Sequence, residues 1–185
     1  MTLKYLLISI IFILIGFVVF RIVVKRDYLR KARLSPISYS LELVIFALHA
    51  NLMYLFIPAK WPNFPTLPNN LTLNIIALII FCFGFIILLP AWFNLGSRTS
   101  FGQGKNKLQT NGLYHFSRNP QLIGYGMMLL SILVLYLSWF SIGWFLQYLI
   151  ISYFMIKSEE EFLQSLYGEE YKTYCSNVPR IIKLH

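Results

Sequence analysis

The last third of the chain carries polar residues of the types that bind charged ligands, on both sides of a long apolar run. A loop containing Arg118 to Pro120 precedes the run, and Glu159, Glu160 and the segment Tyr167 to Tyr171 follow it. Guanidinium and carboxylate groups form strong hydrogen bonds with charged partners. Because they flank a membrane-buried segment, these residues indicate a membrane enzyme rather than a passive anchor.

The composition predicts an integral membrane protein. Of the 185 residues, 57% are hydrophobic and only 12% are charged, and the mean hydropathy is +0.63. Such a balance is expected where lipid is the solvent, so a soluble globule is excluded. The length allows one compact helical domain without a separate soluble unit.

Four apolar runs are long enough to cross a bilayer, because a spanning helix needs about 20 residues. Three of them predict one helix each: 3–24, 37–58 and 71–93. The fourth, 122–156, would extend about 50 Å as one straight helix, so we expect it to fold back. We place the corner at 138–143, where serines, an indole and a glycine suit a turn. The predicted fold is all-α, with five transmembrane helices, a tight final hairpin and a short cytosolic helical tail.

The basic segment from Lys25 to Arg33 sets the predicted orientation. It contrasts with residues 59–70, which hold one lysine, so it should be cytoplasmic and the N-terminus outside. The loop 94–120 and the C-terminal tail are then both cytoplasmic and can share one site. If 122–156 crossed the membrane only once, the Arg118 loop and the acidic pair would lie on opposite faces.

The remaining compositional features narrow the partners. The net charge is +9, but the basic residues lie beside apolar runs, so we assign them to membrane orientation and expect no nucleic-acid partner. Cys82 and Cys175 have neither disulfide nor zinc-ligand spacing, so we expect free thiols and no metal. The first apolar run is longer than a signal peptide's apolar segment and lacks a cleavage site, so we predict a retained membrane span. Because no targeting signal is evident, we expect a multi-pass protein of a bacterial plasma membrane.

Several motifs of the last third occur together in a fixed order. Gly112-Leu-Tyr114 is followed by Arg118-Asn119-Pro120-x-x-x-Gly124, then by Glu159-Glu160, Tyr167-Gly168-x-x-Tyr171-x-x-Tyr174 and Val178-Pro179-Arg180. This pattern, over 108–180, resembles the isoprenylcysteine carboxyl methyltransferase and phospholipid methyltransferase superfamily. The chain departs from it at Asn119, where histidine is usual, and at Leu122, where tyrosine is common. Asparagine donates and accepts like a neutral histidine, but it cannot titrate.

The resemblance implies a cytosolic S-adenosyl-L-methionine pocket with a lipid-facing entry for a lipophilic acceptor, an isoprenylcysteine-like carboxylate or a phospholipid amine. It divides the chain into three N-terminal helices, 1–93, and a methyltransferase core, 94–185. Arg118 suits the cofactor carboxylate, Glu159 or Glu160 its ammonium or ribose hydroxyls, and Tyr114 its adenine. The cofactor-binding candidates are Gly112, Tyr114, Arg118, Asn119, Pro120, Gly124, Glu159, Glu160 and Tyr171.

Methyl transfer from a sulfonium needs neither a metal nor a covalent intermediate, so alignment and exclusion of water can carry catalysis. The catalytic candidates are Arg118, Glu160 and Arg180. An acid acceptor would need a cationic clamp, for which Arg180 and Arg98 are available. An amine acceptor would need a base, Glu160 or His115.

Simpler interpretations accompany these assignments. Arg118 could be an interfacial anchor, and the acidic run beginning at Glu159 could be a solvated helix face. Glu42 and His49 share one face of the second span; Glu42 could be interfacial, and for His49 we favour a packed, hydrogen-bonded role.

Two competing functions stay open. The first is an NADPH-dependent reductase of the sterol type, which has a similar arginine-proline loop and Gly-x-x-Tyr-x-x-Tyr segment. The second is a non-enzymatic membrane scaffold, which predicts no nucleotide-like ligand.

Overall fold

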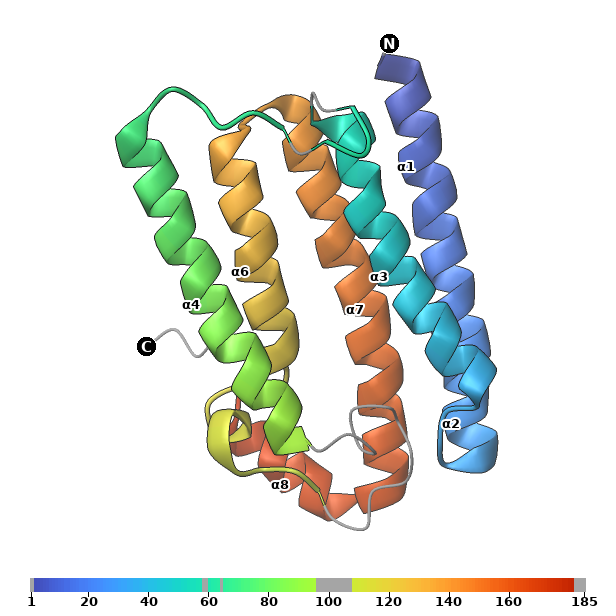
Figure 1. The fold of residues 1–185 in the computed structure, drawn as a ribbon. Helices are drawn as coiled ribbons and strands as arrows, with labels where there is room; N and C mark the ends of the chain where they lie inside the picture. The colour runs from blue at the N-terminus through green and yellow to red at the C-terminus, as the bar shows by residue number, and fades with distance from the viewer. Residues whose placement is uncertain (1, 58–59, 64, 96–107, 182–185) are drawn as a thin grey trace.

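The computed structural model describes residues 2–57, 60–63, 65–95 and 108–181. All regular structure in this part of the chain is helical, which confirms the all-α class. Figure 1 shows long helices side by side, with the short helix α8 across one end of the bundle. The elements in chain order are α1 (Thr2–Phe17), η1 (Val18–Val24), α2 (Lys25–Lys31), α3 (Pro36–Phe56), α4 (Leu71–Leu95), η2 (Gly112–His115), α6 (Pro120–Leu135), α7 (Trp139–Tyr167) and α8 (Glu169–Asn177).

Four helices of the described structure are long and apolar enough to cross a membrane: Leu3–Lys31, Pro36–Phe56, Leu71–Phe93 and Trp139–Tyr167. The multi-pass membrane protein predicted from composition is therefore confirmed at this level. α6 has 16 residues and is about 24 Å long, which is shorter than a hydrocarbon core of about 30 Å. A fifth crossing by α6 stays a prediction.

The long apolar run of the last third is divided between two helices. α6 ends at Leu135, and α7 begins at Trp139 after Ser138 as its N-cap. The Ser138 hydroxyl accepts from the Ser141 N–H at 3.1 Å, and the Ser141 hydroxyl accepts from the Ser138 N–H at 2.8 Å. This reciprocal cap satisfies two of the N–H groups that a helix start leaves without partners. The break lies at 136–138, and Gly143 of the expected corner is inside α7.

α4 and α6 approach each other through a pair of glycines. A Cβ atom added at Gly124 would lie 2.6 Å from the Leu88 nitrogen and 2.7 Å from the Gly84 oxygen. A Cβ atom at Gly84 would lie 2.6 Å from the Gly124 oxygen. Small residues permit this backbone contact, which is a usual mode of helix association in membranes.

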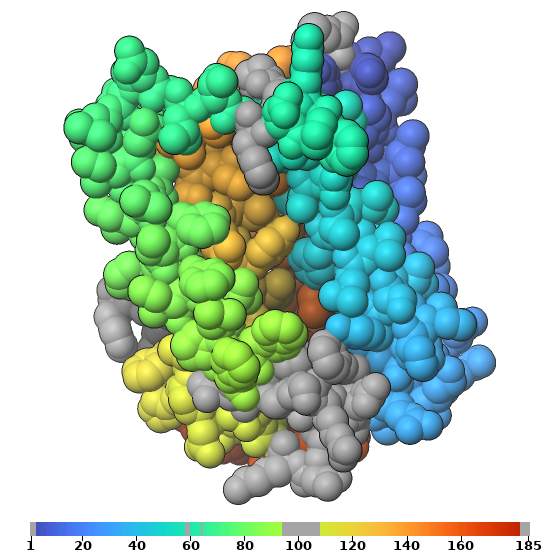
Figure 2. Space-filling view, in the orientation of Figure 1, coloured from blue at the N-terminus to red at the C-terminus, as the bar shows by residue number. Residues whose placement is uncertain are grey.

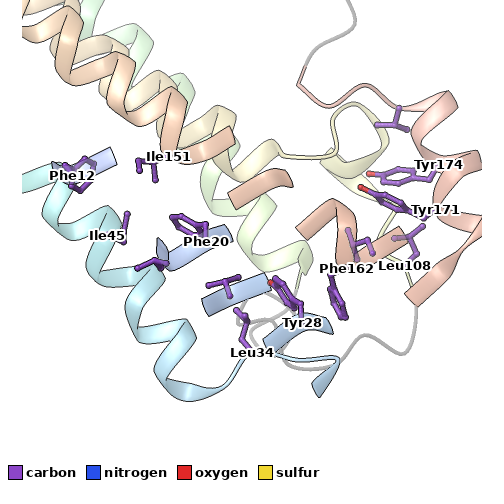
Figure 3. Packing of buried hydrophobic residues seen from close by; sticks show 14 residues of the cluster. Phe12, Phe20, Tyr28, Leu34, Ile45, Leu108, Ile151, Phe162, Tyr171 and Tyr174 are labelled. Carbon is purple, nitrogen blue, oxygen red and sulfur yellow. The ribbon is translucent and has the colours of Figure 1, made fainter. Parts of the chain in front are cut away.

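α1, η1 and α2 form one continuous helical segment. This segment packs with α3 and α7 around a shared apolar cluster. Figure 3 shows Phe12, Phe20, Ile45 and Ile151 converging between these helices. All four side chains are buried, with exposed fractions of 5% or less. The cluster fixes α7 beside α1 and α3.

Polar contacts within the bundle link α3 to α7. His49 stacks on Trp144 with ring centroids 5.0 Å apart, and its Nε2 lies 2.9 Å from the Trp144 carbonyl oxygen. Trp144 Nε1 donates to the His49 carbonyl at 2.9 Å. His49 is thus packed and hydrogen-bonded, the role that the sequence favoured. Glu42 is also buried within the bundle, with 8% exposure, and its depth in the membrane stays a prediction.

An ion-pair cluster ties the π-helical segment η1 to the polar end of α7. Arg21 donates to the Ser158 hydroxyl at 3.0 Å and to Glu161 at 2.8 Å, and Lys25 lies 2.7 Å from the same carboxylate. Ser158 donates to the Phe20 carbonyl at 2.8 Å. These contacts hold the acidic end of α7 against the first helix.

Candidate functional site

The predicted site residues come from segments that meet at the α8 end of the bundle. Gly112 has a φ of +64° at the start of η2, a conformation that glycine adopts without a steric penalty. Pro120 is the first residue of α6, where the missing N–H costs no helical hydrogen bond. Gly168, with a φ of +52°, ends α7 and redirects the chain into α8. These turns bring the loop and the tail together.

Glu160 lies between two arginines and forms the charged centre of the site. Arg118 Nη1 is 2.8 Å from Glu160 Oε1. Arg180 binds the same carboxylate in a bidentate manner, with Nε 2.9 Å from Oε1 and Nη2 2.6 Å from Oε2. The Arg118 and Glu160 side chains are 13% and 17% exposed, whereas Arg180 is 46% exposed. The structure thus brings all three catalytic candidates into direct contact.

Arg118 makes further contacts with α8. Its Nη1 donates to the Tyr171 hydroxyl at 3.3 Å and lies 2.8 Å from Cys175 Sγ. Its backbone N–H donates to the Pro179 carbonyl at 3.0 Å. A residue that serves only as an interfacial anchor does not need this set of partners. The contact with Cys175 was missed from the sequence, which assigned that cysteine only as a free thiol.

Asn119 connects the loop to the chain after α8. Its side-chain Nδ2 donates to the Arg180 carbonyl at 2.9 Å, and its backbone N–H donates to the Ser117 hydroxyl at 3.1 Å. Ser117 is buried and reaches the Arg180 carbonyl at 3.4 Å. Asn119 therefore positions Arg180 through the backbone. No feature of the sequence singled out Ser117.

Three buried tyrosines form the wall of the site. Tyr171 and Tyr174 lie next to each other, with ring centroids 6.2 Å apart and Leu108 beside them (Figure 3). Tyr174 donates to the Tyr114 carbonyl at 2.6 Å. Burial raises the pKa of Tyr174 to about 12, and it raises the pKa values of Tyr114 and Tyr171 well above their usual range. The wall therefore consists of neutral phenols at physiological pH.

A pocket lies among these side chains. Six of its lining residues belong to the predicted cofactor set: Tyr114, Arg118, Asn119, Glu159, Glu160 and Tyr171. The other five are Leu108, Gln109, Ile156, Leu163 and Tyr174; Leu163 and Tyr174 are positions of the sequence motifs, but none of the five was assigned to the cofactor. Helical spacing could have identified two of these residues. Ile156 lies three residues before Glu159, and Leu163 lies three residues after Glu160, so each shares a helix face with one of the acidic residues.

The other predicted residues lie outside the pocket lining. Gly112 and Pro120 shape the backbone before and at the start of α6, and Gly124 packs against Gly84 of α4. His115 is exposed and stacks edge-on with Phe116, with centroids 5.4 Å apart. Arg98 lies outside the described residues.

The donor set of the pocket fits a zwitterionic ligand with an aromatic base. Among the described residues, Arg118 Nε is buried without a hydrogen-bond partner, so one N–H of the guanidinium is available to an anionic group. Carboxylates and buried aromatic rings line the same space. The cavity holds about 30 Å³, room for about two water molecules. The side chains around Glu160 must therefore separate to admit a ligand. In the described chain, no three His, Cys, Asp or Glu residues form a metal-binding group.

Comparison with known proteins gives one match. The sequence model of the phospholipid methyltransferase family matches residues 73–170, which is more than half of the chain. The match begins inside α4 and includes Arg118, Glu160 and the helices between them. No curated protein and no solved structure matches the chain. The resemblance drawn from the motifs is confirmed: the chain belongs to the phospholipid methyltransferase family.

Proposed function

We propose that the protein is an integral membrane methyltransferase that uses S-adenosyl-L-methionine and acts on a lipophilic acceptor. Family membership implies methyl transfer. The observation that carries the finer proposal is the contact of Glu160 with both Arg118 and Arg180, from three segments far apart in sequence. A partly buried carboxylate between two guanidiniums provides partners for both charges of an amino-acid zwitterion.

The pocket residues divide according to the parts of the cofactor. Arg118 would bind the methionine carboxylate through its buried Nε–H group. Glu159 or Glu160 would bind the ammonium group or the ribose hydroxyls, and Tyr114 or Tyr171 would pack against the adenine. When bound, the cofactor supplies an activated methyl group on a sulfonium.

Because the cofactor supplies the activated methyl group, the side chains of the site would align the two reactants and exclude water. Leu108, Leu163 and the neutral tyrosines provide a wall that limits the access of water. Arg180 is the more exposed guanidinium and would hold an acidic group of the acceptor. Glu160 would instead accept the proton of an amine acceptor.

We further propose that α6 crosses the membrane as a fifth span, with the N-terminus outside and the site in the cytoplasm of a bacterial cell. The 2.8 Å contact between Arg118 and Glu160 supports a common side for the loop and the tail, because charged groups in contact cannot lie on opposite membrane faces. The basic segment around α2 supports the cytoplasmic assignment.

Ligand binding and methyl transfer test this function. We would purify the full chain in lipid nanodiscs and measure binding of radiolabelled S-adenosylhomocysteine and of NADPH. Methyl transfer from labelled S-adenosylmethionine to a bacterial lipid extract would follow. We expect tight binding of S-adenosylhomocysteine and a labelled lipid product. Binding of NADPH alone would establish the reductase alternative, and binding of neither ligand would support a scaffold.

A matched pair of variants links the activity to the site. Glu160→Gln should weaken S-adenosylhomocysteine binding about 10-fold to 100-fold, because it removes a charge-assisted contact. Glu169→Gln is the control, because Glu169 is 84% exposed and pairs only with Lys172 among the described residues. Equal affinities in the two variants would contradict the assignment.

A further inference from the structure

The outward face of α2 carries arginines without carboxylate partners. Arg26 and Arg30 are about one helical turn apart on α2, and both are exposed. Arg33 follows in the exposed turn after the helix. None of these three outward arginines forms an ion pair with another described residue. Leu29, between the two helical arginines, is 54% exposed. α2 therefore presents guanidinium groups and one apolar side chain to its surroundings.

The other basic residues of this segment are paired within the protein. Arg21 and Lys25 both contact Glu161, and Lys31 lies 2.9 Å from Asp27. Asp27 is buried and also accepts from the backbone N–H of the α3 N-cap. Both carboxylates are therefore used inside the protein, and the charge of the outward arginines is left for an external partner.

The length of the first helical segment places α2 at the membrane surface. The candidate span Leu3–Lys31 has 29 residues, which corresponds to about 43 Å. A hydrocarbon core is about 30 Å thick, so about 13 Å of the segment lies outside it. Figure 1 shows α2 at the same end of the bundle as α8, and Figure 2 shows the blue segment that includes α2 on the surface of the molecule. The outward arginines therefore lie at the level of lipid head groups.

The inward side of the same segment fixes the turn of α7 that carries the candidate site. It contacts α7 through Ser158, Glu161 and Phe162. These positions are three and four residues apart, so they share one face of α7. Phe162 stacks on Tyr28 of α2, with ring centroids 4.4 Å apart and planes 9° apart. Glu160 is about 100° around the helix from Glu161. Holding this face of α7 therefore fixes the direction in which Glu160 points.

We propose that the outward arginines bind the head group of an anionic phospholipid, and that this binding holds α2 against α7 in the arrangement that binds the cofactor. Guanidinium groups form bidentate contacts with phosphate oxygens. Leu29 can enter the boundary between head groups and acyl chains. Basic segments at a membrane surface are attracted to anionic lipids. The coupling to the cofactor rests on the proposed function, whereas lipid binding does not.

A lipid titration tests the head-group site. We would titrate phosphatidylglycerol into the full chain in neutral detergent and follow bound lipid by native mass spectrometry. Arg26→Gln/Arg30→Gln should weaken binding about 25-fold, from about fivefold for each basic residue. The control Lys4→Gln/Lys60→Gln removes the same charge from exposed lysines at the opposite end of the bundle and should leave this affinity unchanged. Equal weakening in the two variants would indicate attraction to net charge and would overturn the proposal.

A conservative variant guards against a change of membrane orientation. Arg26→Lys/Arg30→Lys keeps the positive charge that orients the segment. It should still bind less lipid than the wild type, because an ammonium group cannot form the bidentate contact. Wild-type affinity in this variant would contradict recognition of phosphate by the guanidinium groups.

Cofactor binding tests the coupling to α7. We would measure S-adenosylhomocysteine affinity in nanodiscs of phosphatidylcholine alone and of an equal mixture of phosphatidylcholine and phosphatidylglycerol. The wild type should bind about fivefold or more tightly in the mixture, and the glutamine variant should show no difference. Equal wild-type affinities in the two nanodiscs would overturn the coupling. If S-adenosylhomocysteine binds in neither nanodisc, the proposed function fails, and the lipid titration still decides the head-group site.

Discussion

Replacing Gly124 with alanine tests whether the contact between α4 and α6 positions the site. The new Cβ would lie 2.6 Å from the Leu88 nitrogen, whereas ordinary contacts begin near 3.4 Å. The two helices must therefore separate by about 0.8 Å, the difference between these distances. The nearest atoms belong to backbone, so no side-chain rotation can relieve the overlap.

The expected magnitude follows from this displacement. Overpacking of this kind costs about 1–3 kcal/mol of folding free energy. Arg118 and Asn119 immediately precede α6, so the shift also moves the polar groups of the pocket. Because a displacement of about 1 Å can reduce an enzymatic rate about 100-fold, we expect methyl transfer to fall about 10-fold to 100-fold.

The assay compares Gly124→Ala with Gly143→Ala in thermal unfolding and methyl transfer. Gly143 is inside α7, and its added Cβ would meet only Phe56 Cε1, at 4.0 Å. The control should be neutral or slightly stabilised, because alanine is favoured over glycine within helices. If the two variants have equal Tm values and equal rates, the close contact does not position the site.

Three further substitutions test the polar contacts. Arg118→Lys keeps the charge but loses the planar fork, so S-adenosylhomocysteine affinity should fall about tenfold by equilibrium dialysis, whereas Lys172→Arg should not change it. Arg21→Met leaves Ser158 and Glu161 without their shared donor and should lower unfolding free energy by about 1–3 kcal/mol in detergent; a loss no larger than that of Lys172→Met would contradict the anchoring role. Ser138→Ala should cost about 1 kcal/mol through loss of the α7 cap, and an unchanged Tm would refute this contribution.

The convergence of loop and tail could be predicted from the sequence because hydropathy, charge asymmetry and one long apolar run constrain it. These properties predicted that Arg118 and Glu160 share one side of the membrane, where the structure places them 2.8 Å apart. They also predicted helices close to α1, α3 and α4. Both inferences use local patterns alone.

Contacts between distant segments could not be predicted in the same way. The packing of Gly124 against Gly84 depends on how two helices approach, and no local pattern distinguishes it from a cofactor contact. The contact between Cys175 and Arg118 depends on the angle at which α8 crosses the bundle. The predicted corner was also displaced, because the reciprocal Ser138–Ser141 cap lies at the start of a helix and Gly143 inside it.

The closed arrangement of Glu160 between Arg118 and Arg180 makes entry to the pocket an exchange of partners. A ligand that bears both an anionic and a cationic group can replace the Arg118–Glu160 and Arg180–Glu160 contacts with equivalent ones. A nucleoside thioether that lacks the amino-acid end would leave the partly buried Arg118 and Glu160 side chains without replacement partners, which is costly. The affinity for methylthioadenosine should therefore be lower than the loss of the amino-acid contacts alone implies. This difference should be present in the absence of a lipid acceptor.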